Sequence, residues 1–186
     1  MNINFLIQNT VSFTIAEIQE ISTIVIETFL INCCFLILFI TTLYYWIKFI
    51  FFPKQKYNTF GFYSLTIANL IIFIQLCLRW FESGHFPLSN LYDSLLFLAW
   101  GLLLIFIFLE KSTKLDLLGI VISPAILCII AFTDFSLPED LQKIKPLVPA
   151  LQSNWLFMHV TVMIFSYASL ILGCLLSISF ILYFYY

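Results

Sequence analysis

Two histidines are the side chains in this sequence best suited to ligand chemistry. His85 and His159 are the only histidines in the chain. A histidine on a helix near a membrane surface is a possible ligand for a metal or for haem iron. The simpler alternative, which position alone favours for both residues, is an interfacial imidazole bonded to a backbone carbonyl.

Two charged residues within apolar stretches come next. Arg79 ends an apolar run. Its side chain is suited either to bind an anionic group such as a propionate or to extend to the membrane interface. The position of the residue favours the second role. Glu27 is the only acid well inside an apolar stretch. A carboxylate within the membrane is a functional candidate by default, but Glu27 is expected near the membrane edge, which favours a structural role.

Other kinds of site find no support in the sequence. There is no nucleophile–base pair, phosphate-binding loop or zinc pattern, so no catalytic residue is predicted. No CxxC occurs, and without CxxCH the chain is not itself a c-type cytochrome. We expect the cysteines to be small apolar fillers of membrane helices. They are Cys33, Cys34, Cys77, Cys128 and Cys174.

The composition predicts what must position these residues. Of 186 residues, 62% are hydrophobic and 10% are charged, with a mean hydropathy of +1.06. A soluble domain carries roughly 25% charged residues. We therefore predict an all-α, polytopic helical membrane protein with about five transmembrane helices. The net charge of −2 and the lack of a basic face exclude nucleic-acid binding.

The apolar runs give the positions of the spans. The first twenty residues lack Lys and Arg, which predicts a short exposed segment and not a cleaved signal peptide. The longest loop, 134–153, contains three prolines. We place the five spans at about residues 22–50, 60–80, 91–109, 115–132 and 154–186.

The basic residues predict which loops share a side of the membrane. When the five predicted spans cross the membrane in alternating directions, five lysines fall on one side, and Arg79 and two lysines fall on the other. This bias places the turns at 51–58 and 110–114 in the cytoplasm or stroma. The N-terminus and the loops 83–89 and 134–153 then face the periplasm or thylakoid lumen.

Two long segments carry a family resemblance. One is LRWFESGHFPLSNLYDSL, from Leu78 to Leu95, and the other is LVPALQSNWLFMHV, from Leu147 to Val160. Both resemble the CcsA (ResC-like) family of the plastid and bacterial system II pathway of cytochrome c biogenesis. The resemblance covers residues 60–186, which we interpret as the N-terminal part of the assembly domain. Residues 1–59 form an N-terminal segment with the first span.

The resemblance implies a role in attaching haem to c-type cytochromes. Family members act with a CcsB-type membrane partner and bring haem, bound transiently as haem b, to the lumenal or periplasmic face. There it is joined to the CxxCH thiols of apocytochrome c. The family's haem histidine in the WLxMHV string maps onto His159, an expected axial ligand to the haem iron; His85 maps onto no haem ligand. The expected location is the chloroplast thylakoid membrane, with a bacterial cytoplasmic membrane as the alternative.

One departure from the family limits these expectations. The tryptophan-rich WWD segment and later histidines of the family should follow the fifth span, so we expect further helices after Tyr186. Without them we expect no haem lyase activity from this chain alone. Two alternatives stay open: a transporter of a small solute, and a structural membrane subunit that holds no haem.

Overall fold

The computed structural model describes residues 3–51, 59–88, 90–113, 116–142 and 154–185, and in these ranges all regular structure is helical. The predicted all-α class is confirmed. The helices are α1 (Ile3–Phe51), α2 (Thr59–Ser83), α3 (Leu91–Thr113), α4 (Asp116–Ala131), the π-helix η1 (Phe132–Ser136), α5 (Glu139–Gln142) and α6 (Asn154–Tyr185).

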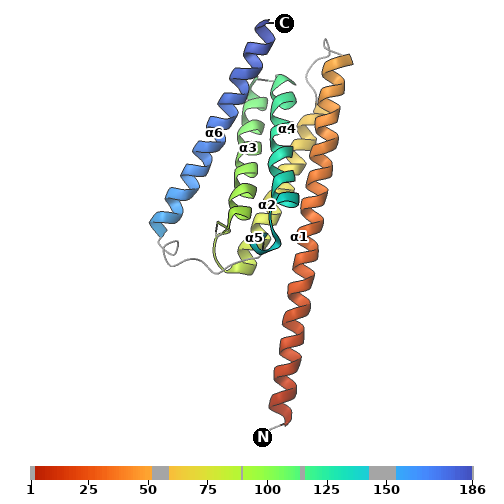
Figure 1. Cartoon of the computed structure of the whole chain (residues 1–186), viewed down its shortest axis with the longest axis vertical. Helices are drawn as coiled ribbons and strands as arrows, with labels where there is room; N and C mark the ends of the chain where they lie inside the picture. Colours follow the sequence, from red (N-terminus) through yellow and green to blue (C-terminus); the bar gives the residue numbers. More distant parts are fainter. Residues whose placement is uncertain (1–2, 52–58, 89, 114–115, 143–153, 186) are drawn as a thin grey trace.

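Five of these helices are long and apolar enough to cross a membrane, as predicted. The candidate spans are Ile21–Phe51, Thr59–Ser83, Leu91–Ser112, Leu118–Ser136 and Phe157–Ile181. The structure changes the prediction at the N-terminus, because α1 begins at Ile3 and continues into the first span without a break. In Figure 1 this early part of α1 extends beyond the end of the bundle.

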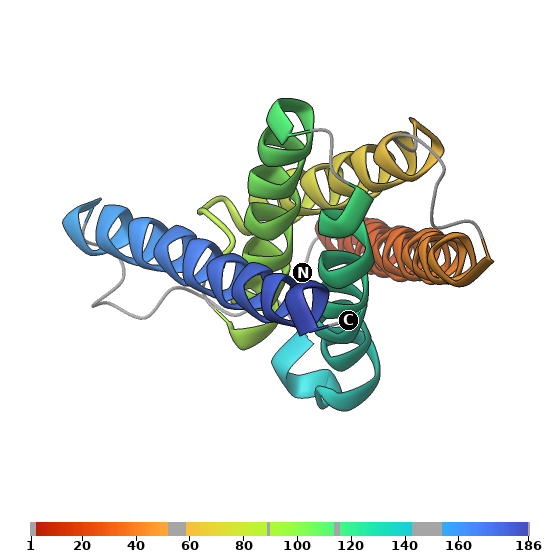
Figure 2. The same cartoon turned by 90° about the horizontal axis from the view of Figure 1, so that it is seen from above.

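The bundle has α3 and α4 at its centre. α1 packs against α2 and α4, whereas α6 packs against α3 and α4. Figure 2 shows α1 and α6 on opposite sides of the molecule. The buried core therefore lies between α1 and α6, and Leu38, Leu65, Leu102 and Ile126 are among its fully buried members.

Close packing depends on small residues beside one buried tyrosine. Tyr45 of α1 is 1% exposed. A Cβ added at Gly61 of α2 or at Gly119 of α4 would collide with the Tyr45 ring. Lipid tails are as apolar as leucine, so membrane helices associate through such close fits and through interhelical hydrogen bonds. One of these runs from Asn69 Nδ2 to the Trp100 carbonyl, at 3.2 Å.

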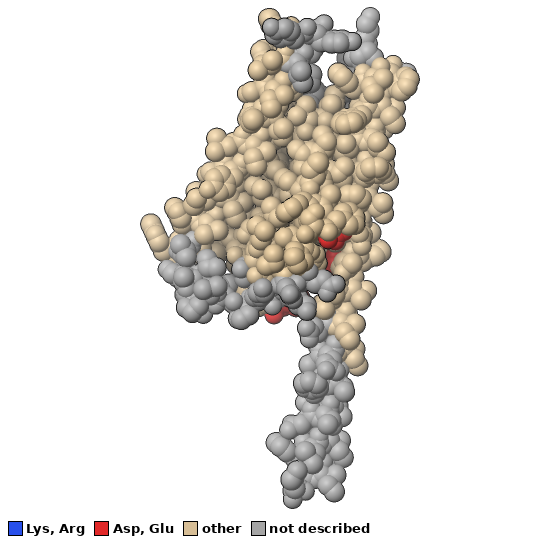
Figure 3. Space-filling model, in the orientation of Figure 1, with Lys and Arg blue, Asp and Glu red and all other residues tan. Residues whose placement is uncertain are grey.

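The outer surface suits a lipid environment. Large apolar side chains such as Phe29, Leu36, Ile40 and Leu70 are 54–66% exposed. Figure 3 shows a face with no basic atom among its described residues, and its few acidic atoms lie toward the lower end of the bundle. A soluble protein does not expose so much contiguous apolar area. The chain is an integral membrane protein.

The loops divide between the two ends as predicted. The 83–88 segment, α5 and the start of α6 lie at one end of the bundle, and the end of α3 and the start of α4 lie at the other (Figure 1). The compartment that each end faces stays a prediction. The turn at 51–58 and residues 143–153 lie outside the described residues.

Candidate functional site

The segment after α2 makes a tight turn that positions His85. Gly84 adopts a left-handed conformation with φ of +66°, and its N–H donates to the Trp80 carbonyl at 3.1 Å. Glycine closes a helix in this way because it lacks a Cβ. The Ser83 hydroxyl donates to the His85 carbonyl at 2.6 Å. His85 Nδ1 lies 3.3 Å from the Phe86 carbonyl, as the simpler interpretation of this histidine predicts.

Phe86 connects this turn to three helices. Its ring centroid lies 5.1 Å from that of Trp80, 5.7 Å from that of Phe97 and 4.7 Å from that of Phe157. All three contacts are edge-to-face, which aromatic quadrupoles favour. Phe157 belongs to the first turn of α6, so the Phe86 contacts hold the beginning of that helix against α2 and α3.

His159 lies on α6 two residues beyond this aromatic anchor and is exposed. Trp155, four residues earlier and therefore on the same helical face, is 83% exposed. Met158 is 58% exposed. An imidazole next to an apolar, aromatic surface suits a flat ligand that carries a metal. Among the described residues, no group of three His, Cys, Asp or Glu side chains that could hold a bare metal ion occurs.

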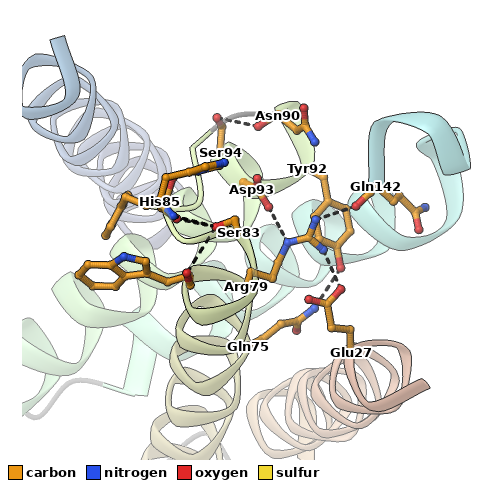
Figure 4. Close-up of polar contacts among 12 residues, drawn as sticks. Glu27, Gln75, Arg79, Ser83, His85, Asn90, Tyr92, Asp93, Ser94 and Gln142 are labelled. Atoms are coloured by element: carbon orange, nitrogen blue, oxygen red, sulfur yellow. Dashed lines mark hydrogen bonds and ion pairs between the residues drawn. The ribbon is translucent and has the colours of Figure 1, made fainter. Parts of the chain in front are cut away.

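A buried ionic cluster lies beside the turn, on the other side of α2 (Figure 4). Arg79 Nη1 donates to Glu27 Oε2 at 2.8 Å, and Nε lies 2.7 Å from Asp93 Oδ1. Nη2 donates to the Gln142 carbonyl at 2.6 Å. The guanidinium carbon lies 4.5 Å from the ring centroid of Tyr92. One arginine thus joins α1, α2, α3 and α5.

The prediction that Arg79 reaches the membrane interface is wrong. The residue is 1% exposed, and each of its three guanidinium nitrogens faces a protein oxygen. Burial is possible because two carboxylates and a carbonyl replace the lost water. Burial also speaks against an external propionate, because the Arg79 side chain is only 2% exposed. Glu27, the intramembrane acid, is accordingly a partner of Arg79.

The sequence held a signal for this cluster. Glu27, Arg79 and Asp93 all lie near the same predicted end of their spans, where an unpaired charge would be costly. Asp93, three residues after Asn90, also has the spacing of a helix-capping residue. The cluster reaches the loop because Gln142 Nε2 also donates to the Leu137 carbonyl, at 2.9 Å. Its role in the fold is to fix α5 and the end of α4 against the bundle.

A model of the cytochrome c assembly protein family matches residues 88–186. The chain belongs to the cytochrome c assembly protein family. The match runs from the end of the tight turn through α3, α4 and α6, and it includes His159. The predicted relationship to CcsA is confirmed.

Curated CcsA proteins are similar over most of the chain. A cytochrome c biogenesis protein CcsA from Chlorella vulgaris is 60% identical over 157 residues, which are 84% of this chain and 50% of that protein. CcsA from Guillardia theta is 53% identical over 79% of the chain and 49% of its own length. CcsA from Rippkaea orientalis is 48% identical over 86% and 47%. The chain thus spans about half the length of the relatives it matches.

Proposed function

We propose that this chain is the haem-presenting part of a system II cytochrome c assembly protein. In this proposal it holds haem at the lumenal or periplasmic face for covalent attachment to apocytochrome c. Its partners are a CcsB-type membrane protein and the apocytochrome, and its location is a thylakoid membrane. The observation that carries the proposal is the exposed His159 beside Trp155 near the start of α6, where Phe157 packs against Phe86.

The imidazole would contribute an axial ligand to the haem iron. Imidazole nitrogens are common haem ligands. His159 is held on a long helix whose first turn is fixed by Phe157 against Phe86, so the position of its backbone is well defined. A ligand on a rigid element holds its cargo in a more constant pose than one on a loop.

The surroundings would hold the porphyrin without covalent chemistry. Trp155 and Met158 offer apolar area next to the imidazole, and the porphyrin ring is itself flat and apolar. Haem is here a cargo that passes to the apocytochrome, whose thiols form the new bonds. The chain's contribution is orientation, which removes the entropy cost of bringing the vinyl groups to the thiols.

The test uses a full-length protein, because the chain spans about half of its relatives. In what we call the chimera, this chain replaces the matched part of the Chlorella vulgaris protein. The chimera is expressed with its membrane partner in cells that lack their own CcsA. We expect His159→Ala to abolish holocytochrome c formation while the chimera itself accumulates normally. Holocytochrome at the unmodified level would contradict the ligand role of His159.

A further inference from the structure

One face of α6 lacks a protein neighbour among the described residues. The helix contacts α3 and α4 through side chains such as Phe165, Ala168 and Leu172. On the opposite face Val162 is 62% exposed, Leu170 67% and Phe180 66%. Only 17% of the best membrane-spanning window of α6 is buried. The exposed face extends along most of the helix.

The composition of this face differs from that of the exposed faces of α1 from Leu36 onward and of α2. Every exposed side chain of α1 from Leu36 to Phe51, and of α2 from Phe60 to Phe81, is Leu, Ile, Phe, Tyr or Trp. These large side chains are typical of lipid contact. The exposed residues of α6 instead include five small ones in its middle. They are Ser166, Ser169, Gly173, Cys174 and Ser177.

These small residues form a smooth track. A Cβ added at Gly173 would meet nothing within 4 Å. The Ser166 hydroxyl donates to the Val162 carbonyl and the Ser177 hydroxyl to the Gly173 carbonyl, both at 2.9 Å. The serines therefore turn back onto their own helix and do not project. Such a surface allows a second helix backbone to approach closely.

The spacing of the track matches helix–helix packing. His159, Ser166, Gly173 and Phe180 follow one another at intervals of seven, and Ser169 and Gly173 are four apart. A seven-residue repeat keeps one seam of a helix against a partner that crosses at about 20°. The track therefore has the register of a helix interface, with His159 at its end.

The membrane limits what can cover this face. Only a backbone whose polar groups are satisfied internally is stable at this depth, which for a helical protein means a transmembrane helix. About half the length of each curated relative is unmatched by this chain. That unmatched half is long enough to contribute several membrane helices.

We propose that the face of α6 formed by Ser166, Ser169, Gly173 and Ser177 is the docking surface for a transmembrane helix from the unmatched half of the family's full-length protein. The docked helix covers the small-residue track and comes alongside His159. The outward faces of α1 and α2 remain in contact with lipid. The proposal does not depend on His159 binding haem.

The test compares one substitution in two proteins. Gly173→Leu is made in the chain as it stands and in the chimera, and thermal stability is measured in the same detergent. The chain alone should be unaffected, because space is open at Gly173 and leucine favours a helix more than glycine does. The chimera should lose several degrees of melting temperature or fail to accumulate. Ile67→Leu on α2 is the matched control at a lipid-facing position and should change neither protein.

Each other outcome overturns the proposal. An unchanged chimera would mean that no helix packs on this face. An equal loss in both proteins would mean that the face is already packed within the chain. If the chain alone forms a dimer that Gly173→Leu dissociates, the occupant is a second copy. Gly173→Ala provides a milder step should the leucine variant of the chimera not fold, and it should lower the melting temperature of the chimera only.

Discussion

Arg79 and Glu27 lie 52 positions apart in the sequence, and their side chains form a 2.8 Å ion pair between α2 and α1. The side chains of Arg79 and Glu27 are 2% and 14% exposed. Asp93 completes the arrangement from α3, at 2.7 Å from Arg79 Nε. Charges this deeply buried stabilise a fold only as a complete set.

Removing the arginine should therefore be severe. We expect Arg79→Ala to lower the free energy of unfolding by roughly 3–5 kcal/mol, because it leaves Glu27 and Asp93 buried without their partner. Arg79→Lys should restore only part of this, since an ammonium cannot reproduce the planar fork of donors. Unfolding of the purified chain by a denaturing detergent measures the change.

The control removes all three charges together. The variant with Glu27→Gln, Arg79→Gln and Asp93→Asn should be more stable than Arg79→Ala alone, since no unpaired charge remains. If Arg79→Ala were as mild as a surface mutation, changing the free energy of unfolding by less than about 0.5 kcal/mol, the cluster would not be buried in the membrane protein.

The close packing of Tyr45 against Gly61 and Gly119 gives a second prediction. Gly61→Ala and Gly119→Ala should each destabilise the bundle by about 1–3 kcal/mol, because the added methyl group collides with the Tyr45 ring. Measurement by the same detergent unfolding would show it. Combining Gly61→Ala with Tyr45→Ala should cost less than the sum of the two single changes. Strict additivity would argue against the contact.

Phe86 gives a third prediction, for the start of α6. Phe86→Ala removes the contacts with Trp80, Phe97 and Phe157 and should loosen the first turns of α6 while leaving α3 in place. Hydrogen exchange followed by mass spectrometry should show faster exchange over residues 154–160. His85→Ala, a change in the same turn, is the control and should leave that exchange unaltered. Equal exchange in the Phe86 variant and the unmodified chain would refute the anchoring role.

A fourth prediction concerns sidedness. Cysteines introduced by Ser83→Cys and Ser136→Cys should react with an impermeant maleimide from the same side of sealed vesicles. Ser83 is the last residue of α2 and Ser136 the last of η1, and these two helices finish at the same end of the bundle. Lys48→Cys and Lys111→Cys should react from the opposite side. Labelling of Ser83→Cys from the cytoplasmic or stromal side would reverse the predicted orientation and remove His159 from the haem-attachment face.

The sequence predicted the helices far better than the contacts between them. Hydropathy alone located all five spans, because a membrane-crossing helix needs about 20 apolar residues whatever its neighbours. It could not show that α1 continues back to Ile3, where the apolar run gives way to a more polar one. An apolar run indicates where a helix crosses the membrane, and it does not indicate how far the helix continues outside the membrane.

For the candidate site, too, the sequence predicted the positions of residues along the helices better than the contacts between helices. The place of His159 and His85 at one end followed from counting spans, and the Trp155–His159 spacing follows from helical periodicity. The Arg79 cluster did not follow, because pairing depends on how three helices rotate against each other. Its charges were visible, but Gln142 contributes a backbone carbonyl, for which no residue type gives a signal.

Ligation of haem by His159 is tested most directly by the visible spectrum of the purified chimera with its partner. His159→Gly should lose the Soret absorbance, added imidazole should restore it, and His85→Ala should keep it. Restoration by imidazole separates a lost ligand from a lost fold. A Soret band in the His159→Gly protein equal to that of the unmodified protein, without imidazole, would contradict the account.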